Sequence, residues 1–257
     1  MQFSKFFLPK FSAFALLTAL AFIATPAAAG DWSWGAKVSG SGNIKTEARI
    51  VSGFNGISLS IPAKAEIIQG AREGISIETD DNILPLIETV IEEGKLKIRF
   101  KDRNMSVSTK TLRMTINVKF IESLAVSGSG DLQAAKLQVT TLKTSIAGSG
   151  DVRIATLDAD TVIVSIAGSG DFSAGGKTNT LEAKIAGSGD IKTEKLAANN
   201  VKLSIGGSGN AKVWAKETLK ISVAGSGDVA YYGDAKVSQS VAGSGSVKRL
   251  GNAPAGI

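Results

Sequence analysis

Apolar and polar residues alternate over most of the chain after about residue 140, which is the pattern of strands with one buried face. Each alternating segment ends just before a Gly-Ser-Gly triplet. The predicted inward residues are Leu142, Thr144, Ile146; Val162, Val164, Ile166; Leu181, Ala183, Ile185; Val201, Leu203, Ile205; Leu219, Ile221, Val223; and Val237, Gln239, Val241. The alternation resumes after the triplets, at Val152 and Ile154, Phe172 and Ala174, Ile191 and Thr193, and Ala211 and Val213. Each unit therefore predicts a strand, a glycine corner, a second strand and a loop of variable length.

The triplets recur at intervals of 18 to 20 residues, beginning at Gly128, Gly148, Gly168, Gly187, Gly207, Gly225 and Gly243, with an isolated copy at Gly40. A unit of this size cannot bury a core alone, so equivalent units must stack, each supplying one layer. The sequence therefore predicts an all-β fold, a parallel β-helix or β-solenoid with about 18–20 residues per coil over residues 128–250.

Residues 49–127 are less regular but also rich in strand patterns. Glu93-Gly94 predicts a turn between strands at 89–92 and 95–100, and Pro85 interrupts a possible helical turn at 83–87. We interpret this part as opening coils or an N-terminal cap, because the first apolar layer of a solenoid needs cover. Residues 30–48 are expected to form a flexible leader and residues 251–257 a flexible tail.

The first 29 residues have the order of a secretory signal peptide: Lys5 and Lys10, an apolar run over 11–24, and three alanines ending at Ala29. The apolar run of about 14 residues is shorter than the roughly 20 that a membrane-spanning helix needs. We predict cleavage near Ala29 and an exported protein, periplasmic or secreted to the cell surface. No transmembrane segment is expected in the mature chain.

Composition excludes several function classes. The chain has no cysteine and no histidine, so disulfides, thiolate nucleophiles, Ser-His-Asp catalysis and zinc sites of the usual ligands are unavailable. Loss of residues 1–29 leaves 27 basic and 23 acidic residues, a net charge of about +4. An excess this small does not indicate a nucleic-acid partner. We expect no cofactor and no metal.

The corner residues form a repeated motif that we predict to be structural rather than catalytic. They are Gly128, Gly130, Asp131, Gly148, Gly150, Asp151, Gly168, Gly170, Asp171, Gly187, Gly189, Asp190, Gly207, Gly209, Asn210, Gly225, Gly227 and Asp228, with Ser246 and Asn43 at the matching positions of the last and the isolated copies. Stacked carboxylates about 5 Å apart repel by roughly 0.8 kcal/mol even in bulk water, so something must offset the repulsion.

Two arrangements could offset the repulsion between the stacked carboxylates. The side chain could accept a hydrogen bond from a nearby backbone N–H in an Asx or ST turn, with glycine supplying a positive φ. A row of Ca²⁺ ions could also neutralise the column. Each coil offers a single carboxylate, and Asn210 and Ser246 keep an oxygen without the charge. This pattern favours the turn.

The outer surface offers one further candidate. The outward position three residues before each corner carries Ser145, Ser165, Lys184, Ser204, Ser222 and Ser240. A solvated face of small polar residues is the simplest interpretation, and a hydroxyl ladder that meets a glycan is the alternative. The aromatic residues Trp214, Tyr231 and Tyr232 are expected to fill the core or cap a coil rather than to form a sugar platform.

The last full strand, with Val237, Gln239 and Val241, ends the solenoid. We expect residues 246–250 to cover it, with Lys248 and Arg249 opposing end-to-end stacking. With this end covered, we expect the protein to be a monomer or a limited oligomer in solution.

The ordered motifs resemble a known family. Residues Arg49-Ile50-Val51-Ser52-Gly53-Phe54-Asn55-Gly56-Ile57, the segment 65–70, Asp80-Asp81-Asn82 and the Ala-Gly-Ser-Gly-Asp repeats are similar to the head GIN domain of putative autotransporter adhesins. The resemblance implies a right-handed single-stranded β-helix in exported proteins of Gram-negative bacteria. The family name also supplies an adhesin label. Because the polar columns are uniform, we expect a structural or adhesin-like envelope module without catalytic activity, whose polar solenoid face meets glycans or surface partners such as an envelope protein.

The alternative function is a carbohydrate-active enzyme, a polysaccharide lyase or hydrolase on a β-helix scaffold. Such an enzyme needs a local pair of carboxylates, or a carboxylate with a basic residue, that stands apart from the scaffold. Here the acidic residues belong to the repeat itself.

Overall fold

The computed structural model describes residues 37–254, so the predicted signal peptide lies outside the described residues. Strands make up 71% of this region, with one 3-10 turn at Leu84–Leu86. The strands are β1 (Lys37–Ser39), β2 (Ile44–Arg49), β3 (Gly56–Leu59), β4 (Lys64–Gln69), β5 (Gly74–Asp80), β6 (Ile87–Glu92), β7 (Lys95–Phe100), β8 (Ser106–Ser108), β9 (Leu112–Val118), β10 (Ser123–Gly128), β11 (Asp131–Gly148), β12 (Val152–Gly168), β13 (Phe172–Gly187), β14 (Ile191–Gly207), β15 (Ala211–Gly225), β16 (Val229–Tyr232), β17 (Lys236–Gly243) and β18 (Val247–Gly251). The predicted all-β solenoid is confirmed.

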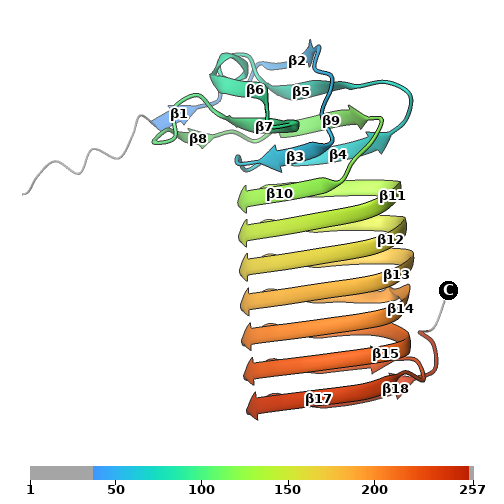
Figure 1. The fold of residues 1–257 in the computed structure, drawn as a ribbon. Coiled ribbons are helices and arrows are strands. Elements are labelled where there is room, and N and C mark those ends of the chain that lie inside the picture. Colours follow the sequence, from blue (N-terminus) through green and yellow to red (C-terminus); the bar gives the residue numbers. More distant parts are fainter. Residues whose placement is uncertain (1–36, 255–257) are drawn as a thin grey trace, which may run out of the picture. The chain divides into compact units, whose positions relative to one another are not determined.

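The strands β11 to β15 each run through most of one coil, and consecutive coils pair in parallel (Figure 1). Equivalent residues align from coil to coil: Leu142 pairs with Val162, which pairs with Leu181. The predicted inward side chains of these coils are buried, including the hydroxyl-bearing Thr144 and Thr193. From β12 to β15, the pairing between neighbouring coils shifts register a few residues after the corner, for example between Ser173 and Gly175 where β13 pairs with β14. The expected loop after the second strand is therefore wrong for these coils: each strand runs continuously through that segment, and register shifts take up the differences in coil length.

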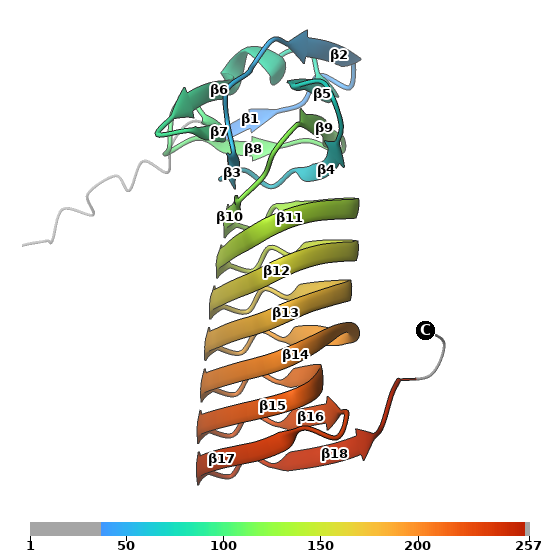
Figure 2. The same cartoon turned by 45° about the vertical axis from the view of Figure 1, so that its right-hand side comes forward.

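Two lines of strands continue the solenoid toward the N-terminus (Figure 2). One line runs β10, β3, β7 and β6, and the other runs β4, β9, β5 and β2. The predicted turn at Glu93-Gly94 is confirmed, because β6 and β7 form an antiparallel hairpin around it and both residues have positive φ. The change from parallel to antiparallel pairing, at β6 and β5, ends the regular stacking.

The expectation of a flexible leader over residues 30–48 needs correction from Lys37 onward. Strand β1 pairs with β8, and β2 pairs antiparallel with β5. Asp80 and Asp81 hold the segment between β1 and β2 in place. Asp80 accepts a hydrogen bond from the Gly42 N–H at 2.6 Å, and Asp81 accepts from the Ser41 hydroxyl at 2.6 Å. The isolated Gly-Ser-Gly copy is therefore an anchored loop.

The expected C-terminal cap is wrong. Strand β18 pairs with β16 and continues the last coil, whereas β17 pairs only with β15 among the described strands. Val237 and Val241, which point inward by register with Leu219 and Val223, each remain 38% exposed. Residues 246–250 extend the last layer and leave β17 uncovered.

Candidate functional site

The first glycine of each corner supplies the left-handed backbone that the corner needs. Gly148 has φ 122° and Gly168 has φ 130°, and the equivalent glycines of the other coils are similar. The third corner position is different: Gly150 has no positive φ. A Cβ added there would lie 2.1 Å from the carbonyl oxygen of Gly130 in the preceding coil. Gly150 is therefore constrained by close stacking of backbones, which corrects the expected reason for glycine at this position.

The fourth corner position forms a ladder of hydrogen bonds between coils. The Oδ1 atom of Asp131 accepts from the Asp151 backbone N–H at 3.2 Å, and Asp151 Oδ1 accepts from the Asp171 N–H at 2.8 Å. The same contact repeats from Asp171 to Asp190, Asp190 to Asn210, Asn210 to Asp228 and Asp228 to Ser246. The predicted acceptor role is therefore right, but the donor lies in the next coil and not in the same turn.

Basic side chains and further donors balance the charge of this ladder. Arg153 forms an ion pair with Asp151 at 2.6 Å, and Lys192 bridges Asp171 at 2.6 Å and Asp190 at 3.5 Å. The hydrogen bond to Asp171 is the main reason why the pKa of Lys192 is raised. No three acidic side chains converge as a metal would require within residues 37–254. The corners thus hold the coils together.

A column of hydroxyl groups runs along the outer face of the C-terminal half of each coil. We call the residues Ser58, Ser145, Ser165, Ser204, Ser222 and Ser240 the hydroxyl column; they share one register position, with Ala125 and Lys184 at the two intervening places. On the corner side the neighbouring column holds Ala147, Ala167, Ala186, Gly206, Ala224 and Ala242. Because most of these side chains are small, the two columns form a flat polar lane, which the longer side chain of Lys184 interrupts.

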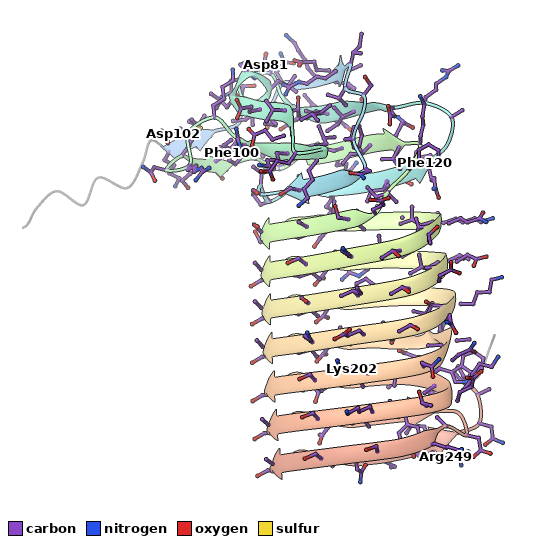
Figure 3. The ribbon with its side chains drawn as sticks, viewed as in Figure 1. Asp81, Phe100, Asp102, Phe120, Lys202 and Arg249 are labelled. Carbon is purple, nitrogen blue, oxygen red and sulfur yellow. The ribbon has the colours of Figure 1, made fainter. Side chains whose placement is uncertain are left out.

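The lane ends in a hollow on the N-terminal part of the molecule. The hollow has a volume of about 420 Å³ and is lined by Ser58, Ser60, Lys97, Arg99, Phe100, Asp102 and Arg103. Ser58 belongs both to the hollow and to the hydroxyl column, since it pairs with Ala125 on one side and Lys97 on the other. Figure 3 shows Phe100 and Asp102 beside each other at this end of the strand stack.

Ion pairs hold two basic residues of the hollow, Lys97 and Arg99, in place. Glu92 contacts Lys97 at 2.6 Å and Arg99 at 3.0 Å, and Glu88 contacts Arg99 at 2.6 Å. Hydrogen bonds from Lys97 and then Arg99 lower the pKa of Glu92, and the bonds of Arg99 to Glu88 and Glu92 raise the pKa of Arg99. Lys97 and Arg99 therefore form, with Glu88 and Glu92, a fixed and charge-balanced set of donors and acceptors in a hollow that Phe100 also lines.

Comparison with known proteins agrees with this fold. A family model described as "Putative auto-transporter adhesin, head GIN domain" matches residues 53–235. The chain belongs to this family. A structure from Bacteroides fragilis, titled a putative adhesin, is 25% identical and has a TM-score of 0.78, covering 83% of this chain and 100% of its own. One from Parabacteroides distasonis, titled a putative lipid binding protein, is 26% identical with a TM-score of 0.72, covering 84% of this chain and 100% of its own.

A third structure, a putative adhesin from Parabacteroides merdae, is 24% identical with a TM-score of 0.68 and shares the fold, covering 83% of this chain and 99% of its own. No curated protein matches the chain. The portion from Lys37 to Pro254 contains no helix long and apolar enough to cross a membrane. The family supports an adhesin-like binding module that is exported or at the surface.

Sequence reasoning found the column but missed the hollow in this head GIN chain. The alternation of Lys97 and Arg99 on a predicted strand was visible, yet nothing in the sequence places Ser58 beside Lys97. Of the aromatic candidates, Tyr231 packs against the core, while Trp214 lies opposite Tyr232 in the next coil and both are half-buried.

Proposed function

We propose that this chain is an exported, non-catalytic module of the bacterial cell envelope that binds an extended glycan. The glycan lies along the hydroxyl column, and its end enters the hollow at Lys97, Arg99 and Phe100. The single observation that carries the proposal is the continuity of the two features through Ser58, which lines the hollow and stands in register with the column.

The chemistry of the lane suits a polymer of sugars. Stacked strands repeat about every 4.8 Å, so the column offers a row of hydroxyl donors and acceptors along one line, interrupted at Ala125 and Lys184. A hydroxyl can both donate and accept a hydrogen bond. The alanine column alongside lets a flat ligand approach closely. A linear, hydroxyl-rich chain matches this row better than a compact ligand does.

The charges of the hollow favour a neutral glycan over a strongly acidic one. Lys97 and Arg99 are already paired with Glu88 and Glu92. Their remaining N–H groups can donate to sugar hydroxyls without a large net positive field. The half-buried ring of Phe100 supplies an apolar surface for one face of a sugar ring.

The same geometry argues against a glycosidase or lyase. A general acid needs a raised pKa so that it holds its proton at neutral pH. Glu92, one of the two carboxylates paired with Arg99 beside the hollow, has a lowered pKa because Lys97 and Arg99 donate to it. Its ion pairs fix it as a structural acceptor. This favours binding without bond cleavage.

A glycan array tests the proposal. The chain from Gly30 onward is expected to bind extended neutral polysaccharides and to leave their length unchanged. Phe100→Ala should weaken binding about tenfold, the scale of losing one buried aromatic contact. Binding to lipid vesicles alone, as the Parabacteroides distasonis relative's title suggests for that protein, would contradict the proposal.

A matched pair of variants tests the lane itself. Ser165→Tyr places a bulky ring on the hydroxyl column, whereas Thr156→Tyr places the same ring on another exposed part of the same coil. We expect the first variant to lose glycan binding and the second to keep it, with equal melting temperatures. Equal loss in both variants, or in neither, would show that the column is not the binding surface.

A further inference from the structure

The second edge of β17 is open at the C-terminal end of the solenoid. Strand β17 pairs with β15, and no other strand between Lys37 and Pro254 pairs with it. The Lys143 N–H donates to Glu122 of the preceding coil, and Ser238 occupies the position equivalent to Lys143. Successive residues of a strand point their backbone groups to opposite edges. The N–H and C=O groups of Val237, Gln239 and Val241 therefore face the open edge.

At the other end of the molecule, the edge of β6 that continues the line of β10, β3 and β7 is covered. At β6, the outermost strand of its line, the Arg49 guanidinium donates to the carbonyl oxygens of Ile87 at 2.7 Å and Leu84 at 2.9 Å. Arg49 also contacts the Thr89 hydroxyl. A charged side chain over an edge is a common protection against strand addition. A head-to-tail chain that joined β17 of one copy to β6 of the next would need this blocked edge, so that arrangement is disfavoured.

The sequence of β17 is a palindrome around the open edge. It reads Val237-Ser238-Gln239-Ser240-Val241, with valines inward, serines outward and glutamine at the centre. Antiparallel pairing of two identical strands about Gln239 places Val237 opposite Val241 of the second copy. Each pair of open-edge residues can then exchange two backbone hydrogen bonds, about six in total. In this pairing, each inward residue of one copy lies opposite an inward residue of the other copy.

Gln239 is the one inward position of the last strand that is polar. The equivalent inward residues of the earlier coils, from Val164 to Ile221, are apolar. A glutamine side chain carries both a donor and an acceptor, so two copies across a two-fold axis can bond to each other. If the last layer only faced water, nothing would favour a residue that can bond to its own copy across a two-fold axis.

We propose that two copies of this chain join tail to tail through antiparallel pairing of their β17 strands, with the two-fold axis at Gln239. Arg249 on β18 confines the contact to this half of the end face. Its side chain donates to the Gly233 carbonyl at 2.9 Å and pairs with Asp234 at 3.2 Å. It stands at the inward position after Tyr231, where a charge opposes burial. Because an isologous contact uses the open edge of both copies, assembly stops at a dimer.

Light scattering on the full exported chain tests the proposal with two variants. Gln239→Lys puts two like charges together at the axis and should weaken association about tenfold or more. Ser238→Lys adds the same charge one residue away, on the outer face, and should leave the dimer intact. Neither change touches a covered core, so circular dichroism should be the same for both. A wild-type monomer at high micromolar concentration overturns the proposal.

Spin labels then fix the direction of the dimer. The chain has no cysteine, so Ser238→Cys and Asn104→Cys each provide a single labelling site. Tail-to-tail pairing predicts a label separation on the order of 10 Å at residue 238. It predicts more than about 60 Å at residue 104, since each copy stacks its strands at about 4.8 Å. A short distance at residue 104, or filaments in solution, would contradict this arrangement.

Discussion

Two glycines of one corner are required for different reasons, and a substitution separates them. Gly148 needs its positive φ, whereas Gly150 needs the absence of a Cβ against the Gly130 carbonyl. We expect Gly150→Ala to lower the free energy of unfolding by about 3 kcal/mol or more, because the coil above must move to make room. Gly150→Val should be at least as severe. Chemical denaturation measures the effect.

Gly206 provides the matched control. It lies in the alanine column, has no positive φ, and an added Cβ there would be 3.7 Å from the Ile185 carbonyl. We expect Gly206→Ala to be neutral or to stabilise by a few tenths of a kcal/mol, since alanine restricts the unfolded chain. A large loss at Gly206 would show that the stacking argument is wrong for this fold.

The aspartate ladder predicts a difference between two substitutions at one position. Asp151→Asn keeps the oxygen that accepts from the Asp171 N–H, so it should be nearly neutral; its ion pair with the exposed Arg153 contributes little. Asp151→Ala leaves that N–H without its partner and should cost about 1 kcal/mol. Thermal melting measures both.

A calcium titration of the same variants distinguishes the ladder from a metal column. If side chains accept from backbone N–H groups, millimolar Ca²⁺ should leave the melting temperature unchanged. A rise of many degrees that a chelator reverses would instead indicate bound ions.

The acceptor role of these residues could be predicted from the sequence, because Asn210 and Ser246 replace aspartate while keeping an oxygen. Their donors could not be predicted. An Asx turn and a bond between coils use the same atoms, and only the register of neighbouring coils decides between them. The same limit applies to Gly150. The sequence predicts a positive φ for glycine in the corner, but the nearest obstacle to a side chain at Gly150 comes from Gly130, a residue 20 positions earlier.

At the scale of elements, two carboxylates attach the segment from β1 to β2. Hydrogen bonds from the Thr109 hydroxyl and then the Gly42 N–H lower the pKa of Asp80, which is 3% exposed. Bonds from the side chains of Ser41 and then Asn43 lower the pKa of Asp81. The attachment depends on both groups being ionised.

Acidification should therefore release this loop before the coils unfold. A carboxyl group whose pKa is lowered by folding stabilises the folded state above its unfolded pKa, near 3.8. That stability is lost as the pH falls through the lower folded pKa. We expect the amide signals of Gly42 and Asn43 to change below about pH 4 while those of β12 to β14 stay. Asp80→Asn should produce the change at neutral pH, and simultaneous loss of all signals would contradict a local release.

The repeat made residues 128–250 predictable because every coil shows the same alternation of apolar and polar residues before a glycine corner. The N-terminal part has no such repeated pattern. Strands β2 and β5 pair antiparallel over a long separation, with Ile44 opposite Asp80, and no local signal announces that pairing. The hairpin of β6 and β7 was predictable because its turn is local. The hollow escaped prediction because it needs β3 beside β7.

At the scale of the molecule, the two ends of the solenoid differ in whether the edge of the last strand is covered. Arg49 covers the edge of β6, and the hollow lies on the β3 and β7 strands nearby. The last coil leaves the edge of β17 open. In the proposed dimer the open edges are joined, so both hollows and both hydroxyl columns face outward. The dimer is then a bivalent form of the proposed glycan module.

Bivalency gives the two proposals a joint prediction. A dimer that binds one glycan-coated surface through both columns gains affinity from effective concentration, by a factor of 10² to 10⁴ when geometry allows. We expect Gln239→Lys to reduce retention on a glycan-coated surface by about 100-fold, while binding to a short soluble fragment stays the same. Ser238→Lys should retain both. Surface plasmon resonance at low and high glycan density measures the difference. If the affinity for the short fragment falls with Gln239→Lys, the open edge itself belongs to the glycan site and the tail-to-tail dimer is not the source of the gain.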